Sequence, residues 1–349
     1  MPKLPALDLK TGANHSPHVV ILGAGASRAA TPTGDANGKL LPVMADFVKT
    51  LGLAQILNRA NVDWIKRNFE DVYDDLYKRD PNAPEVNKID RHIRSYFRSL
   101  VLPNCLTVYD SLLLSLREKD LVASFNWDPL LAQAYNRHAG IQRHLPRLVF
   151  LHGNVGFGFC LKCRRKGPLS ILCENCKGKL TPPPLLYPVH DKNYTRNPFI
   201  AAEWEELEHT LSHAYFLTIF GYSAPKTDTA AIKMMQAAWS KNETQELAQI
   251  EIIDIRPEKE LVSTWKPFIL REHYGVATDL YQSYLAQYPR RSCEALAWAT
   301  LQQTPWQYNR MPSFRSPSEI RSWIAPLVEE EAHLDQGGHF SREPCPTPS

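Results

Sequence analysis

Five short apolar runs, spread over most of the chain, constrain its fold more than any other feature of the sequence. They occupy residues 18–22, 121–124, 148–151, 214–220 and 250–254. Except for the last, which reads Ile-Glu-Ile-Ile-Asp, each run is apolar at successive rather than alternate positions. This pattern is typical of strands buried on both faces of a parallel sheet. Because segments with helical spacing separate the runs, the sequence predicts an α/β fold in which helices cover both faces of the sheet. A weaker last strand is expected at 266–274 and a helix at 275–288.

Small and polar residues follow the first four runs, and the polar Asp254 is the last residue of the fifth. The motifs are Gly-Ala-Gly-Ala-Ser at 23–27, Phe-Asn-Trp-Asp at 125–128, His-Gly-Asn at 152–154, Gly-Tyr-Ser at 221–223 and Asp254. The carboxyl ends of parallel strands meet at one edge, where open α/β sheets bind ligands. Each motif alone also has a plain structural explanation, such as a glycine turn, a buried histidine or a helix N-cap for Asp128 or Asp254. Their recurrence at successive strand ends favours a nucleotide site whose 23–25 turn approaches a phosphate.

A loop and a block of helices lie between the first two runs. Residues 29–41 are rich in Gly, Pro and Thr, and we expect a loop that covers the nucleotide, with an ordinary surface loop as the alternative. The predicted organisation is a flexible arm at 1–17, a nucleotide-binding domain at 18–275 with a helical insertion at 42–119 and a metal module at 157–183, a helical segment at 276–332 and a disordered tail at 333–349.

Four of the seven cysteines form two Cys-x-x-Cys pairs, Cys160 with Cys163 and Cys173 with Cys176. Each pair presents two thiolates from one tight turn, and two pairs supply the tetrahedral sulfur set that suits a structural zinc ion. The odd number of cysteines argues against a disulfide framework and for a reduced compartment. Basic residues around the pairs raise the alternative of a nucleic-acid-binding ribbon, but solvated side chains on a small module are the favoured interpretation.

The overall composition argues against several classes of protein. A net charge of +3 makes no case for nucleic-acid binding by itself. No apolar run reaches membrane-spanning length, and the first residues lack the apolar core of a signal peptide. The expectation is therefore a cytoplasmic protein that contacts neither a membrane nor nucleic acid directly.

Taken in chain order, these motifs resemble the sirtuin family, and within it the divergent bacterial sirtuin-like NADases of antiphage defence. The resemblance spans about residues 18–275 and includes the strand-end motifs, both cysteine pairs and Ile-Ile-Asp-Ile-Arg-Pro at 252–257. It implies a Rossmann-like domain that binds NAD, a small structural zinc module, and an NAD cleft between the two.

The resemblance also implies roles for individual residues. Asn126 and His152 match the catalytic pair, with His152 as the base. The residues that match NAD contacts are Gly23, Ala24, Gly25 and Ser27 in the phosphate loop, Asp128 at the nicotinamide carboxamide, Gly221 and Ser223 at a phosphate and a ribose, and Asp254 at the adenosine ribose.

Two segments depart from the pattern of deacylating sirtuins. Those enzymes follow the phosphate loop with a Gly-Ile-Pro-Asp-Phe-Arg-like segment, whereas this chain has Arg-Ala-Ala-Thr-Pro-Thr-Gly at 28–34. They also carry a Phe-Gly-Glu-type strand that pins the acyl-lysine peptide, and this chain has Leu-Leu-Tyr-Pro-Val-His-Asp at 185–191 instead. The NAD cleft therefore matches the family, and the peptide cleft does not.

We accordingly expect an NAD⁺ hydrolase that cleaves the nicotinamide–ribose bond to give nicotinamide and ADP-ribose, and that acts in antiphage defence by NAD⁺ depletion. The alternatives are an NAD-dependent protein-lysine deacylase, which would use the same residues, and a non-enzymatic NAD or ADP-ribose sensor that regulates a partner. Because an unregulated NADase would harm the cell, we also expect control through a homo-oligomer or through a regulatory partner such as a HerA-type ATPase.

Overall fold

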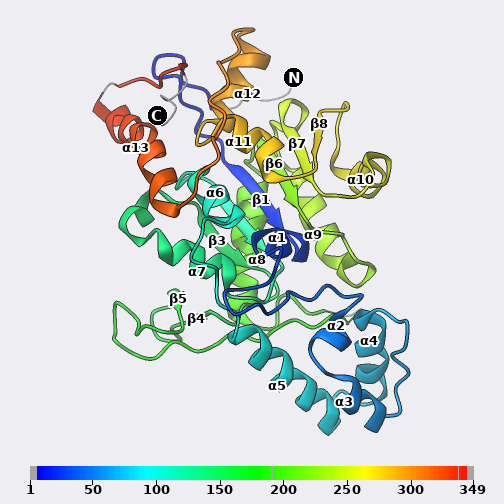
Figure 1. Cartoon of the computed structure of the whole chain (residues 1–349). Coiled ribbons are helices and arrows are strands. Elements are labelled where there is room, and N and C mark those ends of the chain that lie inside the picture. Colours follow the sequence, from blue (N-terminus) through cyan, green and yellow to red (C-terminus); the bar gives the residue numbers. More distant parts are fainter. Residues whose placement is uncertain (1–5, 190–191, 337, 344–349) are drawn as a thin grey trace.

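A six-stranded sheet, in which every pair of neighbouring strands is parallel, lies at the centre of the computed structural model (Figure 1). The structure describes residues 6–189, 192–336 and 338–343. The strands are β1 (His18–Leu22), β2 (Leu121–Ser124), β3 (Arg147–Phe150), β6 (Phe216–Phe220), β7 (Gln249–Ile253) and β8 (Tyr274–Ala277). Their order across the sheet is β3-β2-β1-β6-β7-β8, which is the strand order of doubly wound dinucleotide-binding domains. The predicted Rossmann-like fold class is confirmed.

Helices cover both faces of this sheet, which is why its strands are apolar at successive positions. Val20 and Leu22 of β1 pack on one face, and Val19 and Ile21 pack on the other. The first face is covered by α1 (Ala24–Ala30), α6 (Val108–Leu114) and α7 (Leu130–Arg137). The second face is covered by α8 (Pro198–Leu211), α9 (Thr229–Ser240), α10 (Glu258–Trp265) and α12 (Ser292–Leu301).

A helical lobe follows the loop after α1 and lies beyond the carboxyl edge of the sheet (Figure 1). It consists of α2 (Phe47–Thr50), α3 (Ala54–Arg59), α4 (Phe69–Arg79) and α5 (Pro84–Arg98). The rings of Phe47 and Phe69 stack inside it with centroids 4.3 Å apart. The predicted insertion at 42–119 also included α6, but α6 packs against α1 and α7 and so belongs to the sheet domain.

The last strand lies later in the chain than the sequence predicts. Where a strand is expected at 266–274, the chain forms a 3₁₀ turn at Lys266–Phe268 and then a tight turn with positive φ at Arg271 and Glu272. The true strand, β8, is half-buried at the edge of the sheet and therefore lacks a continuous apolar run. The helix expected at 275–288 is reduced to one turn, α11 (Tyr284–Gln287).

The flexible arm and the disordered tail that the sequence predicts are both packed where the structure describes them. The buried Asn14 donates from its backbone N–H to Glu294 (3.0 Å) and from its side chain to the Cys293 carbonyl (3.2 Å). Phe340 is buried under the guanidinium of Arg291, 3.8 Å from the ring centroid. These contacts fix segments that Pro and Gly content alone marks as irregular. Residues 1–5, 337 and 344–349 lie outside the described part of the chain.

The C-terminal helical segment ends in α13 (Pro317–His333), which packs against α6. Arg290 and Arg291 are buried and both form ion pairs with Glu331 of this helix. Arg291 also pairs with Glu330, so two carboxylates balance the two buried cations. No helix among the described residues is both long and apolar enough to cross a membrane.

Candidate active site and metal centre

A cavity of about 320 Å³ opens at the carboxyl edge of the sheet, where the loops after β1 and β6 meet. The strand order reverses at this point, and doubly wound sheets bind dinucleotides there. The loops after β1, β2, β3 and β6 line one side of the cavity. Residues 41–44 and the lobe residues Phe47, Glu70 and Phe97 line the other side. The helical lobe is therefore part of the cavity wall.

Most of the predicted site residues meet in this cavity. Those that line it are Gly23, Ala24, Gly25, Asn126, Asp128, His152, Gly221 and Ser223. Ser27 is fully buried behind the cavity wall. Asp254 lies at the end of β7, one strand beyond β6, and its carboxylate accepts two hydrogen bonds from the Arg256 guanidinium (3.0 and 3.2 Å). The fold thus brings the ends of four strands together but leaves Asp254 outside the cavity.

The loops after β1 and β6 touch backbone to backbone. A Cβ atom on Gly23 would lie 2.5 Å from the Gly221 carbonyl oxygen, and one on Gly221 would overlap the Ala26 nitrogen. Gly221 also has φ +60°, a conformation that other residues rarely adopt. The Gly25 N–H donates to the Gly221 carbonyl at 2.9 Å, so this donor is engaged within the protein rather than free for a phosphate. The glycines are required for the close packing of the two loops.

Hydrogen bonds from its amide nitrogen fix Asn126 at the end of β2. Nδ2 donates to the Gly23 carbonyl at 2.8 Å and to Ser27 Oγ at 2.9 Å, and it lies 3.4 Å from Tyr109 Oη. Oδ1 makes no hydrogen bond to any described residue and is not among the enclosed polar atoms. Because Asn126 lines the cavity, Oδ1 is an acceptor that a water molecule or a hydroxyl group in the cavity can use.

Asp128 connects the cavity to the protein interior. Its Oδ2 accepts from Ser27 Oγ at 2.7 Å, and its Oδ1 accepts from the Leu130 N–H at 3.1 Å. The N-cap of α7 is Pro129, so Asp128 lies one residue before the cap position. Asn154 donates to the Asp128 carbonyl at 2.6 Å and so ties the loop after β2 to the loop after β3. Burial raises the pKa of Asp128. Each carboxylate oxygen keeps a second lone pair for a ligand.

His152 is buried at the cavity wall in surroundings that favour its neutral form. The Phe125 ring packs nearly perpendicular to it, with centroids 4.8 Å apart. Its Nε2 lies 3.4 Å from Tyr194 Oη and 3.7 Å from Asp228 Oδ1. Burial lowers the pKa of His152 to about 4 and outweighs the opposing effect of the Asp228 carboxylate. The imidazole is therefore neutral near pH 7 and able to accept a proton.

Asp228 and Lys192 form a buried ion pair beside His152. Lys192 Nζ contacts Asp228 Oδ1 and donates to the Thr227 carbonyl at 3.2 Å. Tyr222 Oη donates to Asp228 Oδ2 at 2.7 Å. Burial acts to raise the pKa of Asp228, but the positive charge of Lys192 and the hydrogen bonds from Lys192 and Tyr222 outweigh it and lower the pKa. The carboxylate thus stays ionised next to a neutral imidazole.

Glu70 reaches the cavity from the first turn of α4 in the helical lobe. Its Oε2 accepts from Thr227 Oγ1 at 3.0 Å, while its Oε1 has no partner among the described residues and is not enclosed. Burial raises the pKa of Glu70. Three residues of the site, Glu70, Lys192 and Asp228, were not predicted from the sequence. Glu70 resembles an ordinary first-turn helix residue, and Lys192 lies in an irregular segment. Only Asp228 carries a signal, as the residue before α9.

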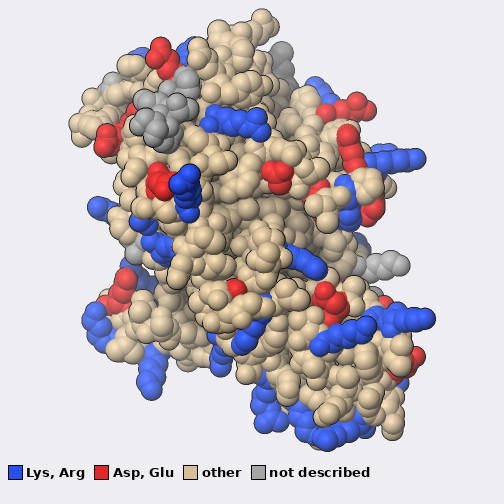
Figure 2. Space-filling view, viewed as in Figure 1, with Lys and Arg blue, Asp and Glu red and all other residues tan. Residues whose placement is uncertain are grey.

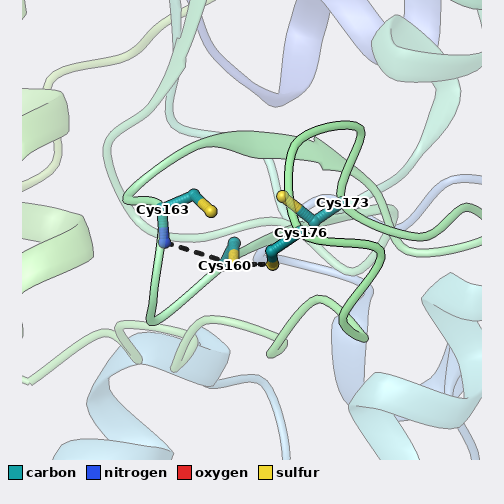
Figure 3. A group of neighbouring side chains, drawn as sticks. All are labelled: Cys160, Cys163, Cys173 and Cys176. Atoms are coloured by element: carbon teal, nitrogen blue, oxygen red, sulfur yellow. Dashed lines mark hydrogen bonds between the residues drawn. The ribbon is translucent and has the colours of Figure 1, made fainter.

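The four paired cysteines converge in a small ribbon built on β4 (Phe157–Phe159) and β5 (Lys166–Pro168) (Figure 3). Their sulfur atoms all lie within 4.8 Å of one another. Each pair closes a tight turn, because the residue directly after the pair donates its N–H to the carbonyl of the first cysteine. Arg164 donates to the Cys160 carbonyl and Lys177 to the Cys173 carbonyl, both at 2.8 Å. Arg164 and Lys177 both have positive φ.

This donor set fits a zinc ion. Four sulfur ligands from two turns match the tetrahedral coordination of structural zinc sites and leave no position for a substrate. The Cys176 N–H hydrogen bond lowers the pKa of Cys173 to about 6, which favours the thiolate that a metal binds. Cys160, Cys163, Cys173 and Cys176 would thus hold zinc in a structural role.

Polar contacts anchor the ribbon to the sheet close to His152. Lys166 donates to Glu203 Oε1 at 2.9 Å and to the Leu148 carbonyl, and Glu203 Oε2 accepts the Phe150 N–H at 2.7 Å. Gly153 has φ +77°, and a Cβ there would overlap the Pro184 carbonyl of the chain leaving the ribbon. The fold of the ribbon therefore supports the strand end that carries His152.

No family model matches the chain, and no curated protein matches it. Among solved structures, it is similar to a sirtuin from a study of sirtuin substrate affinity, with 18% identity and a TM-score of 0.40 over 76% of this chain and 89% of that chain. It is also similar to a Sir2 homologue in complex with NAD, with 14% identity and a TM-score of 0.40 over 86% of this chain and 98% of that chain. Similarity this distant assigns neither a family nor an activity to the chain.

Proposed function

We propose that the cavity binds NAD⁺ and hydrolyses its nicotinamide–ribose bond to release nicotinamide and ADP-ribose. The observation that carries this proposal is the meeting of Asn126 and His152 in one cavity at the strand-order reversal. Asn126 offers a fixed acceptor oxygen, and His152 offers an imidazole that burial keeps neutral. A water molecule held between them would have its position set by one residue and its proton accepted by the other.

Hydrolysis exchanges the bond from ribose C1′ to nicotinamide for a bond from C1′ to water oxygen. Nicotinamide leaves with the bonding electrons, which neutralise its pyridinium charge, and the ribose gains oxocarbenium character in the transition state. Asn126 Oδ1 orients the water, and His152 takes the proton that the water loses. The ionised Asp228 on the cavity wall favours the positive charge on the ribose, and Glu70 Oε1 accepts a ribose hydroxyl.

The segment after the ribbon supports water over an acyl-lysine as the nucleophile. In the deacylating sirtuins that the chain resembles, the corresponding segment is the strand that pins the acyl-lysine peptide. Here the Leu186 N–H donates to the His152 carbonyl at 3.0 Å. The Tyr187 ring packs between Trp127 and Tyr73, with centroid distances of 5.2 and 5.0 Å. Tyr187 therefore joins the segment to the helical lobe rather than leaving an open edge for a peptide.

We place this activity in antiphage defence by NAD⁺ depletion, with control through a homo-oligomer or a partner such as a HerA-type ATPase. The support for the defence role and for the partner is the resemblance of the strand-end motifs. The support for control is the helical lobe, because a partner bound to the lobe acts directly on the cavity wall. Light scattering of the active species tests this point, and full activity from a monomer contradicts it.

The enzymatic proposal is tested by incubating the purified protein with NAD⁺ alone and following nicotinamide and ADP-ribose by chromatography. We expect both products in equal amounts, and their loss in Asn126→Ala and His152→Ala with the fold retained by circular dichroism. Nicotinamide that forms only with an acetyl-lysine peptide, together with acetylated ADP-ribose, would identify a deacylase instead. NAD⁺ binding without turnover would identify a sensor.

A further inference from the structure

The outward side of the helical lobe carries a groove that the proposed chemistry does not use. A hollow of about 740 Å³ lies between α3 and α5, and its basic lining residues are Lys39, Arg59, Lys88, Arg91 and His92. A second hollow of about 400 Å³ continues it along α5 and is lined by Arg91, Arg94, Ser95, Arg98 and Ser99. The two share Arg91, Ser95 and Ser99, so they form one surface, which we call the basic groove.

The sequence of α5 explains why its cations gather on the outside. Its apolar residues Ile89, Ile93 and Phe97 are buried at helical spacing. Arg91, Ser95 and Arg98 repeat at the same spacing on the exposed side. From Lys88 to Arg98 this side of the helix is about 15 Å long, at roughly 1.5 Å per residue. Figure 2 shows Lys and Arg side chains gathered along the edge of the lobe.

Few carboxylates balance this charge. Glu85 pairs with Lys88 at 3.3 Å, and Asp90 pairs with Arg94 at 3.1 Å. The remaining basic groups of the groove make other contacts: Lys39 donates to Ser99 Oγ at 2.7 Å, and Arg91 donates to the Asn87 carbonyl at 3.3 Å. Within the described ranges, no carboxylate lies within ion-pair distance of Lys39, Arg59, Arg91 or Arg98. Asp35 and Glu85 lie near enough to Lys39 and Arg59 to interact with their charges, so these two cations are partly balanced without a direct ion pair. Arg91 and Arg98 carry the least balanced charges of the groove.

We propose that the basic groove binds the phosphate backbone of double-stranded nucleic acid without regard to base sequence. The groove is linear and presents about one cation per helical turn, which suits a repeating anion better than a single small ligand. Ser95 adds a hydroxyl donor of the kind that contacts phosphate oxygens. Single strands bind through exposed aromatic rings, but the Tyr96 hydroxyl here donates to the Leu40 carbonyl and its ring is half-buried.

The net charge of the whole chain gives no indication of this local concentration of cations. A net charge of +3 averages over 349 residues, whereas the groove concentrates four cations that have no direct ion pair, Lys39, Arg59, Arg91 and Arg98, on one side of one lobe. The basic residues that the sequence marks around the cysteines lie on a different surface, the ribbon. The proposal is independent of the NAD⁺ chemistry, because the lining of the groove and the lining of the catalytic cavity have no residue in common.

Fluorescence anisotropy of a short labelled DNA duplex, titrated with the full-length protein over a series of salt concentrations, tests the proposal. Four phosphate contacts predict a slope of about −4 for the logarithm of the association constant against the logarithm of salt concentration. The double variant Arg91→Glu/Arg98→Glu should bind at least about tenfold more weakly at low salt, with a slope shallower by about 2. The matched control Lys162→Glu/Arg165→Glu reverses two exposed charges on the ribbon and should bind like the wild type.

Three results would overturn the proposal. One is the absence of duplex binding by the wild type at low salt. Another is loss of binding in the ribbon variant but not in the groove variant. The third is saturable binding of inorganic pyrophosphate without binding of duplex, which would make the groove a site for a small phosphorylated ligand. Unchanged thermal melting shows that each variant is folded, and Arg91→Ala/Arg98→Ala replaces the groove variant if charge reversal prevents folding.

Discussion

Acidification should weaken the fold through His152. Burial lowers the pKa of this imidazole to about 4 in the folded protein, against 6.5 for an exposed histidine. Between these values the unfolded chain binds a proton at His152 that the folded chain does not. The contribution of His152 to stability is therefore complete above pH 6.5 and is lost as the pH falls toward 4. This makes the neutral state of the proposed base measurable without any substrate.

The magnitude follows from the difference of about 2.5 between the two pKa values. At about 1.36 kcal/mol for each pKa unit, the full effect is on the order of 3 kcal/mol, and roughly 2 kcal/mol of it falls between pH 7 and pH 4.5. Other groups also titrate in this window. Burial lowers the pKa of His18 to about 3, which acts in the same direction, and raises the pKa of Glu251 to about 7, which acts in the opposite direction. Only a comparison between variants isolates His152.

The assay is urea unfolding at pH 7 and at pH 4.5, followed by tryptophan fluorescence, for the wild type and His152→Asn. The variant should lose roughly 2 kcal/mol less than the wild type on acidification, because it lacks the group that the unfolded state protonates. The control His92→Asn removes an exposed histidine on α5 and should follow the wild type. If His152→Asn also follows the wild type, the imidazole takes up its proton equally well in the folded state, and the neutral buried base is refuted.

Three further predictions concern the loop contact, the lobe and the metal. Gly221→Ala should destabilise the fold by about 2–4 kcal/mol in denaturant unfolding, because its Cβ overlaps the backbone of Ala26. Glu70→Gln should raise the KM for NAD⁺ about tenfold, since a hydrogen bond to a charged acceptor is worth about 1.5–3 kcal/mol. Zinc analysis should find one ion per chain, and a chelator or Cys160→Ser should release it and lower the melting temperature.

Each of these has a matched control in the same chain. Gly38→Ala also places an alanine at positive φ, but nothing lies within 4 Å of its Cβ, so it should cost only about 1–2 kcal/mol. Asp71→Asn removes an exposed carboxylate next to Glu70 and should leave the KM unchanged. Cys105→Ser removes an exposed cysteine outside the ribbon and should keep the metal. An equal effect in a variant and its control contradicts the corresponding argument.

The sequence was sufficient for the buried strands and insufficient for the edge strand. A strand such as β1 must be apolar on both faces, so five runs could be recognised without any partner in view. The Tyr-Gly-Val-Ala of β8 is half-exposed at the edge and carries no such pattern. The packed ends of the chain were missed for a related reason. Their order comes from single contacts such as Asn14 to Glu294, which join residues far apart in sequence.

The residues of the candidate site also fall into those that the sequence could predict and those that it could not. His152 and Asn126 could be nominated because each directly follows a strand, and the topology alone brings such positions together. Glu70 and Lys192 follow no strand, and nothing in the local sequence places them at the cavity. Ser27 could be recognised as part of the loop after the first strand. The sequence does not reveal that it is buried and that its hydroxyl bonds Asn126 and Asp128.

Two parts of the chain form the cavity wall, the strand-end loops of the sheet domain and the helical lobe, and each can change in sequence independently of the other. The hydrogen bonds that fix Asn126 and Asp128 lie within the sheet domain and its loops. The lobe contributes Glu70 and the apolar side chains opposite. It is tied to the sheet domain here by the hydrogen bond from Thr227 to Glu70 and by the packing of Phe47 and Phe97 on Trp127. Mutation of the lobe can therefore change which substrate the cavity admits, or how readily it closes, while the bond-breaking residues stay as they are. Related chains with this arrangement are expected to keep the strand ends nearly constant and to diverge in the lobe, and an alignment of such chains would measure the difference.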